Sequence, residues 1–118
     1  MKQILIADDE ELVRSIVRLA LGGRYQLTEA ADGEEAWQKF CSASPKFDLA
    51  ILDLNMPRFS GRELLERIVA RDPNARVVLL TGRPDCEIDP HPGVRVIQKP
   101  FDNSTLAKAV ADLLALNR

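Results

Sequence analysis

Short runs of consecutive apolar residues alternate with longer segments of helical periodicity, and this alternation limits the fold more than any other feature. The runs at 4–7, 49–52 and 77–80 contain no polar residue, which is typical of parallel strands covered by helices on both faces. The segments 25–28 and 94–97 interleave polar and apolar residues, which favours strands at the edges of the sheet. The pattern predicts five strands in a layered α/β fold.

The helical segments begin at residues whose side chains can accept a hydrogen bond from a free backbone N–H group. Asp32 is followed three residues later by Glu35, and Ser60 by Glu63, which is the spacing of a capping box. The last helix is expected to begin at about Asp102. The inner face of the first helix is expected to comprise Leu12, Val13, Ile16, Val17 and Ala20.

The segment between the fourth and fifth predicted strands, residues 82–93, differs from the other connections. It contains Pro84, Pro90 and Pro92. Pro90 lacks the N–H group that a continuing helix needs, and it disfavours helical angles at the residue before it. We therefore expect the fourth helix to be absent or reduced to about one turn.

Composition excludes several classes of protein. The chain has 118 residues with 16 basic and 18 acidic side chains, for a net charge of -2, so bulk electrostatic binding of nucleic acid is not expected. No apolar stretch reaches the roughly 20 residues that cross a bilayer, and we expect a cytoplasmic protein with no membrane contact. Cys41 and Cys86 lack zinc or redox spacing and are expected to stay thiols.

Polar residues stand at the carboxyl ends of the predicted strands, where an open parallel sheet places its ligand site. Asp8 and Asp9 follow the first strand, Asp53 the third, Thr81 the fourth and Lys99 the fifth. Taken alone, the acidic pair suits a helix N-terminus, and Lys99 suits a solvated position. Their convergence at one edge of the sheet favours a functional site.

Three carboxylates gathered at one edge repel one another, and a hard divalent cation relieves that repulsion. Magnesium prefers oxygen ligands, so Mg²⁺ is the expected ion. Lys99 and Thr81 suit binding of phosphoryl oxygens, and the Asp53 carboxylate, with a reference pKa of about 3.9, is ionised at neutral pH and can attack phosphorus directly. The residues indicate phosphoryl transfer.

Four separated motifs carry a family resemblance: Asp8-Asp9-Glu10, the run 53–57 with Gly61 after it, Thr81-Gly82, and Lys99-Pro100-Phe101. With these motifs in this order, the whole chain resembles the receiver domain of two-component response regulators. The resemblance implies a single receiver domain over residues 1–118. It also implies a flavodoxin-like, doubly wound, five-stranded parallel sheet of order 2-1-3-4-5.

The resemblance also implies a role for each site residue. Asp53 is the expected phosphoacceptor, and Thr81 and Lys99 are the expected phosphoryl-binding switch pair. The expected Mg²⁺ ligands are Asp9 directly, Asp8 mainly through water, Asn55 through its backbone carbonyl, and Asp53. The implied partners are a sensor histidine kinase or histidine phosphotransfer protein, as source of the phosphoryl group, and an unknown downstream protein.

One position departs from the family pattern, because Val96 stands where receivers usually have an aromatic switch residue. Together with the Pro-rich segment, it indicates an atypical output face. The alternative is a receiver-like docking module with weak or no phosphorylation switching. A third hypothesis, a phosphohydrolase of the haloacid dehalogenase type, needs a second acid two residues after the nucleophile, where this chain has Asn55. We therefore expect a phosphoacceptor module and not an enzyme.

Overall fold

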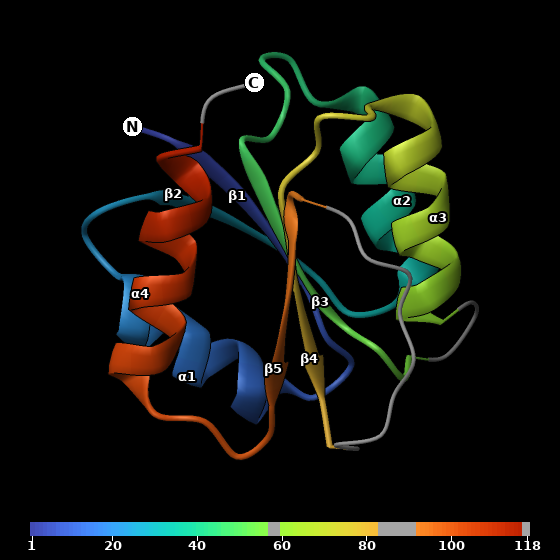
Figure 1. The fold of residues 1–118 in the computed structure, drawn as a ribbon. Helices are drawn as coiled ribbons and strands as arrows, with labels where there is room; N and C mark the ends of the chain where they lie inside the picture. Colours follow the sequence, from blue (N-terminus) through green and yellow to red (C-terminus); the bar gives the residue numbers. More distant parts are fainter. Residues whose placement is uncertain (57–59, 83–91, 117–118) are drawn as a thin grey trace.

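Five parallel strands form one sheet in the computed structural model, which describes residues 1–56, 60–82 and 92–116. The spatial order is β2-β1-β3-β4-β5, as predicted, and the strands point the same way in Figure 1. Their bounds are β1 Gln3–Ala7, β2 Gln26–Ala30, β3 Leu49–Asp53, β4 Val77–Thr81 and β5 Val94–Gln98. The two segments with interleaved polar residues are confirmed as the edge strands.

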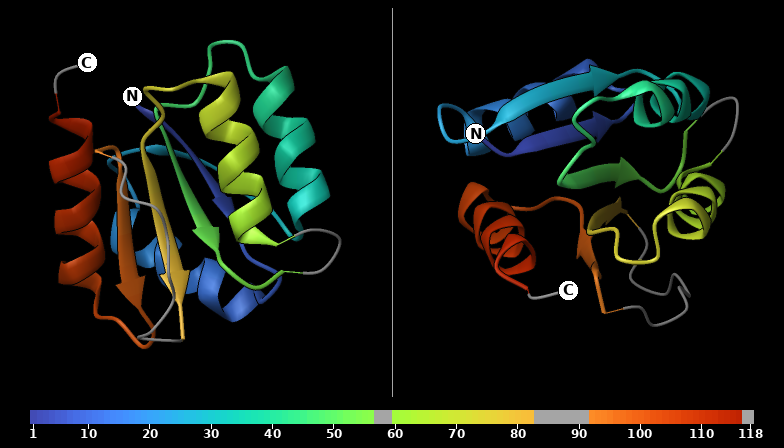
Figure 2. Two further views of the ribbon diagram at one scale, coloured as in Figure 1. Left: turned by 45° about the vertical axis from the view of Figure 1, so that its right-hand side comes forward. Right: turned by 90° about the horizontal axis from the view of Figure 1, so that it is seen from above.

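Helices cover both faces of this sheet. Helices α1 and α4 pack together on one face and α2 and α3 on the other (Figures 1 and 2). Their bounds are α1 Glu11–Leu21, α2 Gly33–Ser42, α3 Gly61–Arg71 and α4 Asn103–Leu114. Within the described ranges no helix is long and apolar enough to cross a membrane.

Alternate residues of each central strand enter two separate hydrophobic cores. In β1, Ile4 and Ile6 belong to the core beneath α1 and α4, whereas Leu5 and Ala7 belong to the core beneath α2 and α3. The strand β3 divides in the same way, and all five of its residues are buried. This explains the absence of polar residues from the central runs, because both faces of these strands are covered.

The helix starts follow the capping prediction closely. The carboxylate of Asp32 accepts a hydrogen bond from the backbone N–H of Glu35 at 2.8 Å, and Ser60 accepts from Glu63 at 3.2 Å. Asp102 accepts from Thr105 in the same manner at 2.7 Å. These side chains satisfy N–H groups that have no partner within the helix.

Two details of the predicted helices are wrong. The side chain of Glu35 accepts a hydrogen bond from the N–H of Ala31, one residue earlier than a strict capping box requires. Leu12 was expected on the inner face of the first helix, but it is 72% exposed, and Leu21 is buried instead. The fully buried residues of α1 are therefore Val17 and Leu21, which lie in the core shared with α4.

The connection between β4 and β5 lies largely outside the described residues, which stop at Gly82 and resume at Pro92. The prediction of at most one helical turn between the two strands therefore falls on residues 83–91, outside the described chain. Gly93 and the start of β5 lie within it. Cys86 falls in the same segment, while Cys41 is a free thiol.

Candidate phosphoryl-transfer site

The predicted site residues lie together at the carboxyl edge of the sheet. Asp8 directly follows β1, Asp53 and Thr81 are the last residues of β3 and β4, and Lys99 directly follows β5. Asp8, Asp53 and Thr81 are buried, with no more than 5% of each residue exposed. Three polar residues buried in a small domain require partners to offset the loss of hydration.

Lys99 supplies that partner for both buried carboxylates. Its Nζ atom lies 3.4 Å from Oδ2 of Asp8 and 3.3 Å from Oδ1 of Asp53. The backbone N–H of Lys99 donates to the carbonyl of Thr81 at 2.7 Å, which fixes Lys99 beside the end of β4. The ammonium group therefore binds two acids from different strands.

Burial is the main cause that alters the proton affinities of the two carboxylates. Burial, with the negative charge of Asp8 as the second cause, raises the pKa of Asp53 to about 6. Burial also raises the pKa of Asp8, although the Glu10 N–H group and Lys99 oppose that change. Burial opposes the charge of Lys99, but Asp53 and Asp8 outweigh it and raise the pKa of the ammonium group. At neutral pH Asp53 is therefore mainly ionised.

An acidic cluster extends from Asp8 toward solvent. Carboxylate oxygens of Asp8, Asp9 and Glu10 lie within 4.8 Å of one another. Asp8 is buried, whereas Asp9 and Glu10 are exposed. Glu10 was not among the predicted ligands, although its place in the acidic run was a signal for it. Oxygen-rich clusters of this composition suit hard divalent cations.

Backbone contacts hold the two buried carboxylates. Oδ1 of Asp8 accepts a hydrogen bond from the N–H of Glu10 at 2.9 Å, and Oδ1 of Asp53 accepts one from Asn55 at 3.3 Å.

Gly61, at the start of α3, donates its N–H to the carbonyl of Leu54 at 2.9 Å. A Cβ atom at Gly61 would lie 2.1 Å from the Asp53 carbonyl oxygen, so only glycine permits this approach.

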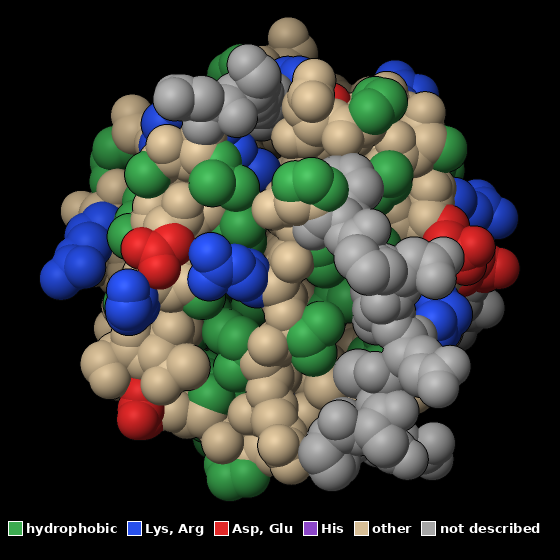
Figure 3. Space-filling model, viewed as in Figure 1, with side chains coloured by type: hydrophobic (Ala, Val, Ile, Leu, Met, Phe, Trp, Pro, Cys, Tyr) green, Lys and Arg blue, Asp and Glu red, His purple; other side chains and the backbone are tan. Residues whose placement is uncertain are grey.

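The predicted atypical switch position is the middle residue of β5, opposite Leu79 of β4. Val96 on β5 is 45% exposed, and Figure 3 shows hydrophobic side chains reaching the surface around this strand. The segment 83–91, to which the sequence assigns part of the output face, lies outside the described residues.

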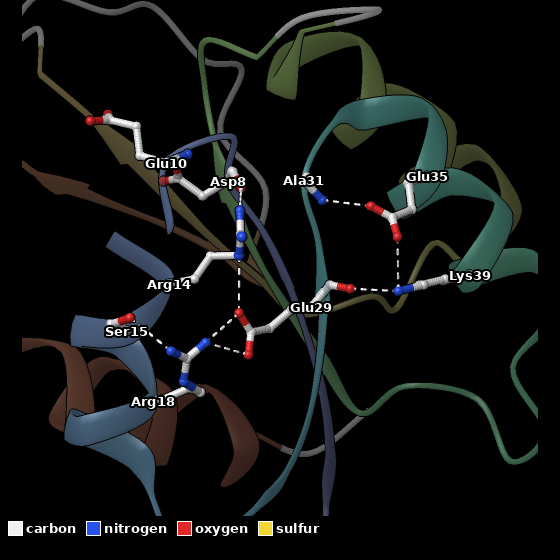
Figure 4. Close-up of polar contacts among 9 residues, drawn as sticks. All are labelled: Asp8, Glu10, Arg14, Ser15, Arg18, Glu29, Ala31, Glu35 and Lys39. Atoms are coloured by element: carbon white, nitrogen blue, oxygen red, sulfur yellow. Dashed lines mark hydrogen bonds and ion pairs between the residues drawn. The ribbon is translucent and has the colours of Figure 1, made fainter. Parts of the chain in front are cut away.

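Sequence reasoning missed one group that contacts the site. The guanidinium group of Arg14, on α1, donates to the backbone carbonyl of Asp8 at 2.6 Å and to Oε1 of Glu29 at 3.0 Å (Figure 4). No local pattern indicated this contact, because it joins a helix, a strand end and an edge strand.

Comparison with known proteins gives a consistent result over most of the chain. The chain is 28% identical to the response regulator receiver protein CpdR of Brucella abortus, over 97% of this chain and 98% of CpdR. It is 31% identical to part of the sensor histidine kinase TmoS of Ectopseudomonas mendocina, over 97% of this chain but only 12% of TmoS. It likewise spans only 19% of a longer relative from Haloferax volcanii.

Solved structures agree with this result. The response regulator TrrA of Thermotoga maritima, crystallised in complex with Mg²⁺ and BeF, superposes with a TM-score of 0.80 at 34% identity, covering 96% of this chain and 99% of TrrA. The family model for the response regulator receiver domain matches residues 4–111. With its fold, strand order and motif positions all in agreement, the chain belongs to the response regulator receiver domain family.

Proposed function

We propose that this chain is a phosphoacceptor module that takes a phosphoryl group onto Asp53 with the help of Mg²⁺. Receiver domains are signalling modules, and the observation that carries the specific assignment is the position of Lys99. Its ammonium group lies within 3.4 Å of both Asp8 and Asp53. A buried carboxylate with a cation at its oxygen has the charge arrangement that phosphoryl transfer needs.

The donor set of the site fits Mg²⁺. Asp8, Asp9 and the backbone carbonyl of Asn55 supply oxygen ligands, together with the Asp53 carboxylate, and magnesium is commonly held by one or two carboxylates and retained waters. The structure adds Glu10 to the surrounding negative charge. When bound, Mg²⁺ supplies positive charge to phosphoryl oxygens. Burial, and secondly the negative charge of Asp8, raise the pKa of Asp53, and a bound cation would offset the unfavourable charge.

The proposed transfer is balanced by one bond formed and one broken. An oxygen of ionised Asp53 attacks the phosphorus of a phosphohistidine, the O–P bond forms, and the P–N bond breaks with its electron pair returning to the imidazole, which takes a proton. Lys99 holds a phosphoryl oxygen by charge, and the Thr81 hydroxyl donates a hydrogen bond to another. Water later attacks phosphorus, releasing inorganic phosphate and regenerating Asp53.

The source of the phosphoryl group is proposed to be a sensor histidine kinase or a histidine phosphotransfer protein. A stretch similar to this chain occurs within one such kinase, TmoS. We also propose that the downstream partner is a protein, which binds a surface near β5 and the 82–93 segment.

Incubation with acetyl phosphate and Mg²⁺, followed by intact mass measurement, tests the assignment. We expect one phosphoryl group on the wild-type chain and none on Asp53→Asn. Asp9→Ala should bind Mg²⁺ more weakly and be labelled more slowly. Label that persists in Asp53→Asn, or that maps to Asp8 or Asp9, would contradict the proposal.

A second candidate function is docking without an effective phosphorylation switch. Val96 favours it, because this exposed β-branched residue is stiff at its first torsion and cannot alternate between buried and exposed poses as an aromatic ring can. The labelling experiment separates the two functions. A wild-type chain that folds but takes no label would support the docking module.

A further inference from the structure

The guanidinium group of Arg14 lies between the acidic end of β1 and the edge strand β2. Its Nη1 donates to the Asp8 carbonyl at 2.6 Å, and its Nε donates to Oε1 of Glu29 at 3.0 Å. Figure 4 shows Arg14 pointing from α1 into this gap between the two acids. Only 15% of the Arg14 side chain is exposed, so the contacts are partly shielded from water.

The position of the Asp8 carbonyl group determines how the carboxylates of the acidic cluster are placed. It belongs to the peptide group that joins Asp8 to Asp9, and a peptide group is planar and rigid. The N–H of Asp8 is already held by the carbonyl of Ala30 at 3.1 Å. A second anchor on the Asp8 oxygen therefore fixes the plane from which the Asp9 backbone continues, and with it the relative placement of the two carboxylates.

Glu29, which accepts a hydrogen bond from Arg14, is itself held in place by several other contacts. Both carboxylate oxygens of Glu29 accept hydrogen bonds from Nη1 of Arg18 at 2.5 Å, and the Glu29 backbone carbonyl accepts from Lys39 at 2.6 Å. Lys39 in turn pairs with Glu35 at 3.0 Å. Contacts from α1 and α2 thus converge on one residue of β2, as Figure 4 shows.

We propose that Arg14, supported by Glu29, is a positioning residue for the divalent-cation site of this chain. It acts through the Asp8 carbonyl and does not itself touch the cation or the phosphoryl group. This inference rests on the proposed function, since it assumes that Asp8 and Asp9 bind Mg²⁺. Groups that orient metal ligands from behind commonly change metal affinity by about 10- to 100-fold when they are removed.

The sign of the effect distinguishes positioning from charge. Arg14 is a cation beside a cation site, so simple Coulomb repulsion predicts that removing its charge strengthens Mg²⁺ binding. The positioning role predicts the opposite, because Asp8 and Asp9 lose their fixed arrangement. A substitution that removes the charge and weakens binding therefore cannot be explained by electrostatics alone.

Arg14→Gln and Arg18→Gln form a matched pair for the experiment. Each removes one positive charge from α1 and one partner of Glu29, but only Arg14 of the two donates to the Asp8 carbonyl. Mg²⁺ titration of the full chain, followed by the amide chemical shifts of Asp9 and Glu10, measures the affinity. We expect binding about tenfold weaker in Arg14→Gln and unchanged or slightly tighter in Arg18→Gln.

Labelling by acetyl phosphate provides a second readout. At low Mg²⁺ concentration Arg14→Gln should be labelled more slowly than wild type, and saturating Mg²⁺ should restore the rate, which it would not do for a general loss of structure. If Arg14→Gln fails to fold, Arg14→Lys keeps the positive charge but lacks the guanidinium fork that donates both to the Asp8 carbonyl and to Glu29. It should weaken Mg²⁺ binding in the same direction by a smaller factor.

The outcomes separate the two proposals. Wild type that binds Mg²⁺, with affinity unchanged or increased in Arg14→Gln, would overturn the positioning role and leave the proposed function standing. Equal weakening in Arg14→Gln and Arg18→Gln would also overturn it, since only one of them contacts Asp8. Failure of the wild-type chain to bind Mg²⁺ would overturn both proposals.

Discussion

The Nζ atom of Lys99 lies 3.3 Å from Oδ1 of Asp53, which joins the end of β3 to the residue after β5. Without this cation the pKa of Asp53, already about 6 from burial and from Asp8, would be higher still. The ion pair therefore helps to keep the proposed nucleophile ionised at neutral pH.

The pH dependence of phosphorylation follows from this pKa. Only ionised Asp53 attacks phosphorus, so the labelling rate at Mg²⁺ concentrations far below saturation, where the profile reports the metal-free site, should be nearly constant above pH 7. It should fall about tenfold per pH unit below about 6, as the carboxylate takes up a proton. Initial rates with acetyl phosphate from pH 4.5 to 8 would measure the profile. A midpoint near the reference value of about 3.9 would contradict the raised pKa.

Replacing Lys99 should shift the pH profile of the labelling rate to higher pH. Lys99→Met removes the cation that lowers the pKa of Asp53, so the midpoint of the rate profile should shift to higher pH and the rate at pH 7 should fall. Lys46→Met is a suitable control, because Lys46 is an exposed lysine that pairs with Asp72 at 3.4 Å. Equal midpoints for Lys99→Met and wild type would count against the role of Lys99.

Asp53 should also reduce the stability of the fold at neutral pH. Its pKa is raised from 3.8 to about 6, so the folded state binds the proton more tightly than the unfolded chain. The resulting stabilisation is present below pH 3.8 and is lost as the pH rises through about 6. Asp53→Asn should therefore increase the free energy of unfolding at pH 7 in metal-free buffer, by on the order of 2 kcal/mol.

Urea denaturation of Asp53→Asn at pH 7 and pH 4 would measure this effect. The gain should shrink toward zero at pH 4, where wild-type Asp53 is protonated. Asp112→Asn is the matched control, since Asp112 forms a surface pair with Lys108 at 3.2 Å, and such pairs contribute about 1 kcal/mol or less. A loss of stability in Asp53→Asn at pH 7 would refute the prediction.

Gly61 should not tolerate a side chain. A Cβ atom there would lie 2.1 Å from the Asp53 carbonyl oxygen and 2.8 Å from Cα of Leu54, and both are backbone atoms that cannot rotate away. We expect Gly61→Ala to lower the free energy of unfolding by about 3 kcal/mol. Gly82→Ala is the control, because nothing lies within 4 Å of a Cβ there. Equal stabilities of the two variants would show that α3 can shift.

The response to phosphorylation should appear mainly in residues 82–93. Val96 has no ring to report a movement of Thr81, and Gly82, at the start of this segment, has open space around it and permits rearrangement. Hydrogen exchange with and without beryllofluoride and Mg²⁺ would measure it. Changes confined to β5 and α4, with residues 82–93 unaltered, would contradict this route of output.

Most of the fold could be predicted because its signals are local. Uninterrupted apolar runs marked the three central strands, and interleaved polar residues in β2 and β5 marked the edges. Asp32, Ser60 and Asp102 marked helix starts because their caps bond residues three positions away. Leu12 was misplaced because periodicity identifies an apolar stripe but does not show where neighbouring helices stop covering it.

The sequence predicted which residues form the site, but it did not predict all of the contacts that they make. Asp8, Asp53, Thr81 and Lys99 stand at strand ends, so parallel topology alone brings them to one edge. The sequence did not indicate that Lys99 binds two carboxylates at once. Nor did the sequence predict that Arg14 contacts the Asp8 carbonyl and Glu29. A contact between a helix, a strand end and an edge strand has no fixed spacing along the chain.

The division of each central strand between two cores determines where the sequence can accept insertions and deletions. In β1 the alternation that places Ile4 and Ile6 in one core and Leu5 and Ala7 in the other runs directly into Asp8. Inserting one residue within β1 would exchange the faces of the side chains that follow it in the strand, moving the apolar groups and the Asp8 carboxylate together. Lengthening a loop at the opposite edge of the sheet changes neither. Insertions and deletions should therefore be tolerated at that opposite edge and excluded from the strands.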